Sequence, residues 1–262
     1  MAQNTPRKPR IVFSTGAGVS AESGITTFRD AGGLWEQYPV MQVASAEGFA
    51  ADPELVHRFY NERRRQLVTC SPNDAHRLIA DLEKDFDVRV ITQNVDDLHE
   101  RAGSSNVLHL HGELMKIRSI PHPDYVETLT PPTSGQQVPA SSVDKPAANP
   151  DGTVPAGVLD TSPATRGRNG DPMRPHIVFF NEAVPNITPA MELAQSADIF
   201  VVIGTSLNVY PAAGLISCVR PGTPIYYIDP NPARTPAGLN VTVLPTTATA
   251  GMADLAGRLR GQ

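Results

Sequence analysis

The stretch GAGVSAESGITTFRD, residues Gly16–Asp30, decides the fold of this chain. It follows the apolar run Ile11–Phe13, which is typical of a short buried strand. Gly16 and Gly18 allow a tight turn, and Ala21 completes the weaker G-x-G-x-x-A form of the dinucleotide fingerprint. Glycine lets the backbone approach a pyrophosphate closely, and the N-terminus of the next helix offers free N–H groups. The pattern predicts a dinucleotide-binding turn; the alternative is a tight turn that binds nothing.

Polar residues and further glycines follow this turn, where an ordinary dinucleotide site would continue into an amphipathic helix. Phe28, Arg29 and Asp30 are followed by the pair Gly32-Gly33. We expect a lid that closes over a bound ligand and brings an aromatic ring and a guanidinium to it. This departure disfavours a hydride-transfer dehydrogenase.

Strands and helices alternate along the rest of the chain. The expected strands cover residues 88–92, 107–110, 177–180, 199–203, 225–228 and 241–244. The expected helices cover residues 53–68, 73–82, 188–196, 211–219 and 251–259, and a further short helix after Asp97 runs to Gly103 as its C-cap. This alternation predicts an α/β fold with a doubly wound, Rossmann-like parallel sheet. Ligands bind such sheets at the carboxyl ends of the strands, where the polar residues of this chain collect.

Residues 119–174 differ in composition from the rest of the chain. Within Pro121–Pro175 lie 11 of the 25 prolines, and the segment shows little periodicity. We predict a small irregular inserted module here. The expected nucleotide-binding domain is therefore split into residues 1–118, which include the lid and a helical insertion, and residues 175–262.

Composition narrows the classes of function. The 262-residue chain has a formal net charge of −5, which disfavours a nucleic-acid partner. No stretch is long and apolar enough for a membrane span, and the N-terminus lacks the apolar core of a secretory signal. Two cysteines, Cys70 and Cys218, exclude a disulfide scaffold and suit a reducing compartment. We expect a cytoplasmic protein with no membrane partner.

Two groups of chemically capable residues follow the strands expected at 88–92 and 107–110. Gln93, Asn94 and Asp96 supply amides and a carboxylate that can orient a sugar hydroxyl, a water or a carboxamide. The alternative is an Asx turn with a helix cap. His111, before Gly112, is a candidate general base near neutral pH; the alternative is a structural histidine.

The later strands end in residues that suit phosphate and ribose. Gly204-Thr205-Ser206 follows a fully apolar strand, and such a small-residue turn can approach a phosphate. Asp229 ends the next strand and can accept hydrogen bonds from ribose hydroxyls, or it can cap a proline-rich turn.

Tyr60 and Arg63 lie three residues apart on an expected helix and therefore share a face. A phenol beside a guanidinium makes a good carboxylate clamp, because arginine offers a planar, bidentate fork. The alternative is that Arg63, Arg64 and Arg65 form a solvated basic face, which composition alone favours.

In their order along the chain, these motifs resemble the sirtuins, the NAD-dependent protein lysine deacylases. The matching stretches are GAGVSAESGITTFRD, TQNVDDLHERAG, HLHGEL, FFNEAVP, GTSLNVYPA and TATAG. The resemblance covers nearly the whole chain apart from residues 119–174. It implies NAD as the cofactor and acyl-lysine proteins or peptides as substrates, with nicotinamide and O-acyl-ADP-ribose as products.

The resemblance also implies roles for individual residues. In catalysis His111 would be the general base, acting beside Asn94 and Asp96. The residues implied to contact NAD are Gly16, Ala17, Gly18, Ser20, Phe28, Arg29, Gln93, Asn94, Asp96, Gly204, Thr205, Ser206, Asp229 and Ala250. Those implied to contact the substrate are Ala31, Tyr60, Arg63, Asn181, Glu182 and Ala183, the last three by pairing with its backbone as a strand.

The Tyr60-x-x-Arg63 pair resembles the acid-acyl pocket of the class III sirtuins, which binds the carboxylate of succinyl- or malonyl-lysine. Ala31 stands at the matching small position and leaves room for a longer acyl chain. The resemblance therefore implies lysine desuccinylation and demalonylation, with weaker deacetylation.

The chain departs from the sirtuin pattern in its inserted module. Sirtuins usually carry zinc on two CxxC pairs, but here Ser119 and His122 stand near the first pair and the second has no counterpart. Since four cysteine or histidine ligands are lacking, we expect no structural zinc. Three further positions differ: Thr26 replaces a common proline, Asn181 a usual glycine and Asp229 a usual asparagine.

Two alternatives stay open on sequence. A mono-ADP-ribosyltransferase or NAD glycohydrolase would cleave the same nicotinamide bond, but it has no need of an acyl-carboxylate clamp. A non-catalytic NAD-sensing or interaction protein would bind NAD without turnover of any acyl-lysine peptide.

Overall fold

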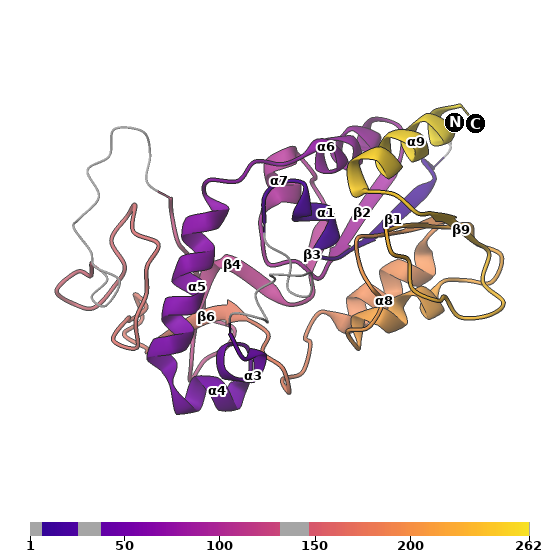
Figure 1. Cartoon of the computed structure of the whole chain (residues 1–262). Helices are drawn as coiled ribbons and strands as arrows, with labels where there is room; N and C mark the ends of the chain where they lie inside the picture. Colours follow the sequence, from indigo (N-terminus) through magenta and orange to yellow (C-terminus); the bar gives the residue numbers. More distant parts are fainter. Residues whose placement is uncertain (1–6, 26–37, 132–146, 262) are drawn as a thin grey trace, which may run out of the picture.

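The computed structural model describes residues 7–25, 38–131 and 147–261, and these form two sheets (Figure 1). The larger sheet has six parallel strands in the order β3-β2-β1-β7-β8-β9. Its strands are β1 Arg10–Thr15, β2 Asp87–Thr92, β3 Val107–His109, β7 Ile199–Ile203, β8 Ile225–Ile228 and β9 Val241–Leu244. The smaller sheet is antiparallel, in the order β5-β4-β6, with β4 Gly112–Ser119, β5 Val126–Thr128 and β6 Met173–Ile177. The predicted α/β class and parallel sheet are confirmed.

The helices differ greatly in length. The α-helices are α1 Gly18–Ala21, α3 Val40–Val43, α4 Ala46–Ala51, α5 Pro53–Leu67, α6 Asp74–Asp81, α7 Leu98–Ala102, α8 Ile187–Ser196 and α9 Ala248–Arg260. Two 3₁₀ helices, η1 Leu82–Lys84 and η2 Ala212–Cys218, complete the set. Within the described ranges, no helix combines the length and the apolar character that a bilayer crossing needs.

The parallel sheet is buried on both faces, which explains its apolar strands. Successive residues of a strand point to opposite faces, so Ile11 and Phe13 of β1 pack with α6 and α9, whereas Val12 packs with α8 and η2. Figure 1 shows these two helical layers on either side of the sheet. The result is a three-layer domain with its polar strand ends at one edge.

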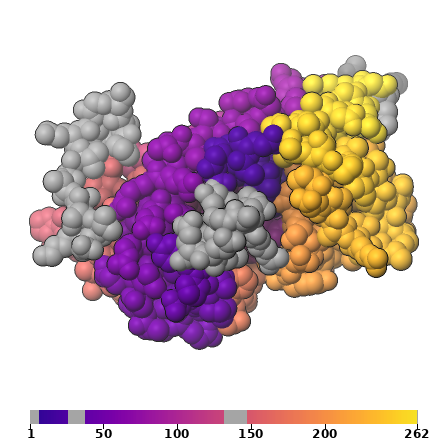
Figure 2. Space-filling model, in the orientation of Figure 1, coloured from indigo at the N-terminus to yellow at the C-terminus, as the bar shows by residue number. Residues whose placement is uncertain are grey.

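A second core lies beneath α5 and the small sheet. It joins Phe59 and Tyr60 of α5 to Leu114 and Ile117 of β4, together with Phe179. Figure 2 shows this smaller lobe beside the sheet domain in one elongated body. Since β4 and β6 bracket the inserted segment, the predicted domain boundary between residues 118 and 119 falls inside β4.

Local sequence signals explain where several helices begin and end. The Asp52 side chain accepts from the Leu55 N–H at 2.9 Å and caps α5, with Pro53 in its first turn. Asn73 caps α6 by accepting from Ala75 N–H at 2.9 Å. Gly103 ends α7 in the left-handed conformation, with φ of 106°.

Two predicted elements are wrong in detail. The strand expected at 177–180 lies earlier, at Met173–Ile177, and belongs to the small sheet. The apolar residues after Ile177 lie beyond the end of β6. There Val178 N–H donates to His111 O and Phe180 N–H donates to Ala44 O. The helix expected at 211–219 is η2, since it has the tighter i→i+3 bond from Gly214 N–H to Pro211 O at 3.0 Å.

Candidate active site

Two glycine turns pack directly on one another at the carboxyl edge of the parallel sheet. Gly16 N–H donates to Ile203 O at 3.0 Å, and Gly18 N–H donates to Gly204 O at 2.9 Å. A Cβ on Gly18 would lie 2.6 Å from Gly204 Cα, and Gly204 itself has φ of +60°. The fingerprint glycines are therefore required first for this close approach of β1 and β7, and α1 behind them is only four residues long.

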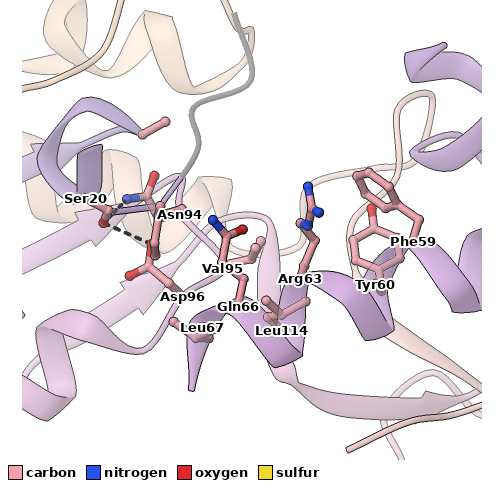
Figure 3. A pocket seen from close by; sticks show the side chains of 12 residues that line it. Ser20, Phe59, Tyr60, Arg63, Gln66, Leu67, Asn94, Val95, Asp96 and Leu114 are labelled. Carbon is pink, nitrogen blue, oxygen red and sulfur yellow. Dashed lines mark hydrogen bonds between the residues drawn. The ribbon is translucent and has the colours of Figure 1, made fainter. Parts of the chain in front are cut away.

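A buried polar group forms behind this turn, where α1 meets the end of β2 (Figure 3). Ser20 Oγ donates to Asp96 Oδ2 at 3.0 Å, and Asn94 Nδ2 donates to Ser20 Oγ at 3.0 Å. All three residues are at most 9% exposed. Burial raises the pKa of Asp96, although the Leu98 N–H and the Ser20 hydroxyl partly offset it. The predicted pair Asn94 and Asp96 thus lies with Ser20 in one site.

Two buried histidines stand behind this group. His76 Nε2 lies 3.4 Å from Ser20 Oγ, and His99 Nε2 lies 3.1 Å from Thr15 Oγ1. Their rings meet edge to face with centroids 4.8 Å apart. Burial lowers the pKa of His76 to about 4 and that of His99 well below its ordinary value. Both rings are therefore neutral at physiological pH and serve to fix the hydroxyls.

His111 follows β3, and its imidazole ring is held by one hydrogen bond to a backbone carbonyl. Its Nδ1 lies 3.0 Å from Gln93 O; a carbonyl only accepts, so we assign the ring proton to Nδ1 and the free lone pair to Nε2. Burial lowers the pKa of His111 below its ordinary value, although the Gln93 carbonyl acts in the opposite direction. At neutral pH His111 is an unprotonated base.

His109 differs from His111 in its partners. It contacts Asn94 O at 3.0 Å and the Glu100 carboxylate at 2.8 Å. Burial lowers its pKa, but the hydrogen bond and charge of Glu100 outweigh burial, so the net shift is upward. His109 is therefore a structural histidine tied to α7.

The remaining predicted NAD contacts follow β2, β7 and β8 or begin α9. Gln93 Nε2 donates to Thr205 Oγ1 at 3.2 Å, which links two of these turns. Ser206 is exposed, and Asp229 Oδ1 accepts from Asn231 N–H at 2.8 Å as a turn cap. Ala17 lies between the two fingerprint glycines, and Ala250 lies in the first turn of α9 rather than in a loop. Phe28, Arg29 and Ala31 lie outside the described residues.

Tyr60 and Arg63 line the same pocket as Ser20, Asn94 and Asp96. In Figure 3 the buried polar group stands at one end of the pocket and Arg63 with Tyr60 toward the other. Tyr60 is 5% exposed, and burial raises the pKa of its phenol, which stays a neutral hydroxyl. The geometry brings the predicted clamp and the predicted catalytic amide and carboxylate into one cavity.

The Arg63 guanidinium is only partly satisfied. Its Nη2 lies 3.8 Å from Glu62, and its Cζ lies 5.4 Å from the centre of the Phe59 ring. Among the described residues, its buried Nε and Nη1 have no hydrogen-bond partner. Because Arg64 is fully buried and the Arg63 side chain is only 20% exposed, the alternative of a solvated basic face is wrong.

The segment Asn181–Ala183 lies apart from this pocket. Asn181 has φ of 71°, a conformation that asparagine tolerates better than most residues and that glycine also provides. The Glu182 carboxylate accepts from Arg174 Nη1 at 2.7 Å, Arg118 Nη2 at 3.2 Å and Phe179 N–H at 2.8 Å. The Glu182 side chain therefore anchors the segment internally, while Ala183 is exposed.

Ser119 and His122, which stand near the expected position of the first cysteine pair, both contact one carboxylate, that of Asp171. Asp171 Oδ2 accepts from Ser119 Oγ at 2.6 Å and Asn169 Nδ2 at 2.6 Å, and it lies 2.8 Å from His122 Nδ1. In the part of the chain that the structure describes, no three histidine, cysteine or acidic side chains are grouped to hold a metal. This donor set does not fit a tetrahedral zinc, which needs four ligands.

We therefore expect metal chelation to leave the protein unchanged. Prolonged treatment with 1,10-phenanthroline should shift the melting temperature by less than about 1 °C, because no metal-linked folding energy is lost. Elemental analysis of the untreated protein checks the same point. A stoichiometric zinc signal, or a clear loss of stability that added zinc restores, would contradict the prediction.

Several pocket residues were not found from the sequence. The additional lining residues are Ile25, Phe59, Gln66, Leu67, Val95 and Leu114. Helical spacing from Tyr60 and Arg63 would have found Phe59, Gln66 and Leu67, which lie on the same side of α5. His76 carried a local signal as well, since it completes a capping box with Asn73.

Comparison with known proteins shows which family this chain is similar to. Residues 16–211 match the profile of the Sir2 family. The chain is 50% identical to a Bacteroides thetaiotaomicron protein named NAD-dependent protein deacylase, over 94% of this chain and 95% of that protein. It is 43% identical to a Helicobacter pylori (strain 26695) protein of the same name, over 95% and 96% respectively. A crystal structure of a Sir2 homologue in complex with NAD superposes with a TM-score of 0.75 and 34% identity, over 97% of this chain and 90% of that one.

Proposed function

This chain belongs to the Sir2 family and is an NAD-dependent protein deacylase, and from this premise we propose that it removes succinyl and malonyl groups from lysine side chains. We propose weaker activity on acetyl-lysine. The observation that carries the proposal is the partly buried Arg63 guanidinium, whose Nε and Nη1 are buried and have no hydrogen-bond partner among the described residues.

The chemistry of this pocket suits an acid acyl chain. Buried guanidinium nitrogens without hydrogen-bond partners are costly, and the carboxylate of an acid acyl chain would satisfy such a nitrogen with a charge-assisted hydrogen bond. Tyr60 supplies a neutral hydroxyl on the same face of α5, and Phe59, Leu67 and Leu114 give apolar walls for methylene groups. An acetyl group has no charge to offer Arg63, so it gains less from this pocket.

The residues at the sheet edge fit NAD by the chemistry of their donors and acceptors. The Asn94 amide can donate to and accept from a carboxamide, the Asp96 carboxylate can accept from one, and the glycine turns let the backbone approach a pyrophosphate. When bound, NAD supplies the ribose carbon to which the acyl oxygen is transferred. We propose that Asn94 and Asp96 orient the nicotinamide and its ribose. We also propose that His111 Nε2 removes the proton from a hydroxyl group of that ribose.

The site also defines the partner that we propose. Acyl-lysine has to enter as part of a peptide or protein, and residues 181–183 would pair with its backbone. A reducing, cytoplasmic setting agrees with the free thiols of Cys70 and Cys218.

The test is a comparison of acyl-lysine peptides that differ only in the acyl group. With NAD present, we expect kcat/KM for succinyl- and malonyl-lysine to exceed that for acetyl-lysine by about tenfold or more, since a charge-assisted pair contributes about 1.5–3 kcal/mol. Peptide mass and nicotinamide release are followed together. A preference for acetyl-lysine would refute the proposal, and NAD consumption without peptide change would favour a glycohydrolase.

A further inference from the structure

Helix α5 presents two adjacent rows of side chains, because residues three and four apart lie on one side of a helix. One row faces the pocket, and the next is turned toward the inserted module and is at most 2% exposed. The pocket row consists of Tyr60, Arg63 and Leu67, and the second row of His57, Asn61 and Arg64.

The second row centres on Arg64, which has no exposed surface. Its Nε donates to Leu114 O at 2.8 Å, and its Nη1 donates to Asn61 Oδ1 at 2.8 Å. Nη1 also lies 3.3 Å from both Leu159 O and Thr161 Oγ1. Burial lowers the pKa of Arg64 to about 10, with Asp160 acting in the opposite direction. A buried charge of this kind stabilises little by itself, but its fixed fork defines geometry.

The inserted module supplies the partners of this row through Leu159–Thr161. Asn61 Nδ2 donates to Thr161 O at 2.8 Å, and Thr161 N–H donates back to Asn61 Oδ1 at 2.9 Å. His57 Nδ1 lies 2.7 Å from Thr161 Oγ1. The Asn61 side chain thus pairs with the backbone of the inserted module and fixes the position of Thr161 along α5.

The same network reaches the opposite wall of the pocket. Leu114, whose carbonyl accepts from Arg64, lines the pocket, and its N–H donates to Val95 O at 2.7 Å. Val95 stands between Asn94 and Asp96 in the chain. Arg64 therefore connects the helix that carries the clamp to the strand next to the catalytic amide and carboxylate.

From these contacts we propose that Arg64, Asn61 and Thr161 are positioning residues for acyl specificity. They fix the orientation of α5 about its axis and its position along that axis, so that Tyr60 and Arg63 face the pocket. They themselves do not touch substrate. The inserted module, which here fits no zinc, thereby sets the acyl preference through Leu159–Thr161. This inference rests on the proposed function.

The test compares Arg64→Lys with the wild type on matched succinyl- and acetyl-lysine peptides. Lysine keeps the charge but cannot span the Leu114 carbonyl and the Asn61 amide with a planar fork. We expect kcat/KM for succinyl-lysine to fall about tenfold, mainly through KM, because a displaced Tyr60–Arg63 clamp binds the acyl carboxylate less well. That for acetyl-lysine should fall by less than about twofold, because an acetyl group does not use the clamp. Arg77→Lys, an exposed arginine paired with Asp74 on α6, is the matched control and should keep the wild-type ratio.

A second variant guards against a folding failure. Thr161→Val replaces the hydroxyl that His57 and Arg64 contact with a methyl group of similar volume, and we expect the same change of ratio at about threefold. Melting temperatures separate lost stability from changed specificity. If both peptides lose activity equally in the folded variants, or if the ratio is unchanged, the inference is wrong. If Arg63→Met also leaves the ratio unchanged, the proposed function fails with it; if Arg63→Met abolishes the preference and Arg64→Lys does not, only this inference fails.

Discussion

The His111→Gln variant should lose deacylation of every acyl-lysine peptide by at least about a hundredfold, because general-base catalysis contributes about 10²–10⁴-fold. Glutamine can still occupy the space beside the Gln93 carbonyl, but it offers no basic nitrogen where Nε2 stands. The measurement is kcat/KM for succinyl- and acetyl-lysine peptides. Both should fall alike, since the base acts on the reaction and not on the acyl chain.

The pH profile gives an independent check on His111. Its pKa is lowered by burial, and the neutral ring is the active form. Activity should therefore rise with pH on a limb that lies below the ordinary histidine pKa of about 6.5 and should be flat through pH 7 to 8. ADP-ribose binding, measured by calorimetry, should survive the substitution. If His111→Gln kept turnover within about threefold of the wild type, the assignment of the base would be wrong.

The Arg63→Met variant should lose about a hundredfold in kcat/KM for succinyl- and malonyl-lysine while keeping activity on acetyl-lysine. Methionine fills a similar volume beside Phe59 but removes the charge that pairs with the acid carboxylate. A hundredfold corresponds to about 2.7 kcal/mol, within the range for a buried, charge-assisted pair. The ratio of the two activities, and not either one alone, is the diagnostic quantity.

Two companion variants sharpen this result. Arg63→Lys keeps the charge but not the bidentate fork, so it should retain an intermediate preference. Tyr60→Phe removes one hydroxyl and should cost succinyl-lysine less than Arg63→Met does. Equal losses on succinyl- and acetyl-lysine in Arg63→Met would mean that Arg63 supports the fold and not acyl recognition.

Most of the parallel sheet could be predicted because its strands are short apolar runs followed by small or polar residues. The run Ile199–Ile203 before Gly204 is an example, and the structure places it next to β1. The small sheet was missed, although Met115–Arg118 alternates between apolar and polar residues. Its partner β6 contains Pro175 and pairs across the irregular insertion, so no local pattern identified it.

Some residues of the candidate site could likewise be predicted from the sequence, and others could not. Residues at strand ends could be placed together because parallel strands end at one edge, and Ser20, Asn94 and Asp96 do share a site. The burial of Arg64 could not be predicted, because a run of three arginines is usually solvated. Its burial depends on Leu159–Thr161, which lie 95 to 97 residues further along the chain.

The position of β1 has a consequence for synthesis. β1 is a central strand whose two neighbours arrive at very different times: β2 starts at residue 87, whereas β7 starts at residue 199. A nascent chain that has not yet reached residue 199 therefore exposes one unpaired edge of β1, whose central residues Ile11–Phe13 are apolar, and such an edge is a template for aggregation. The glycine turn at Gly16–Gly18 likewise lacks its Gly204 support until then. Translation has to pass the entire insertion before the nucleotide edge can assemble, so chains that stop early are substrates for chaperones and proteases and not partly active enzymes.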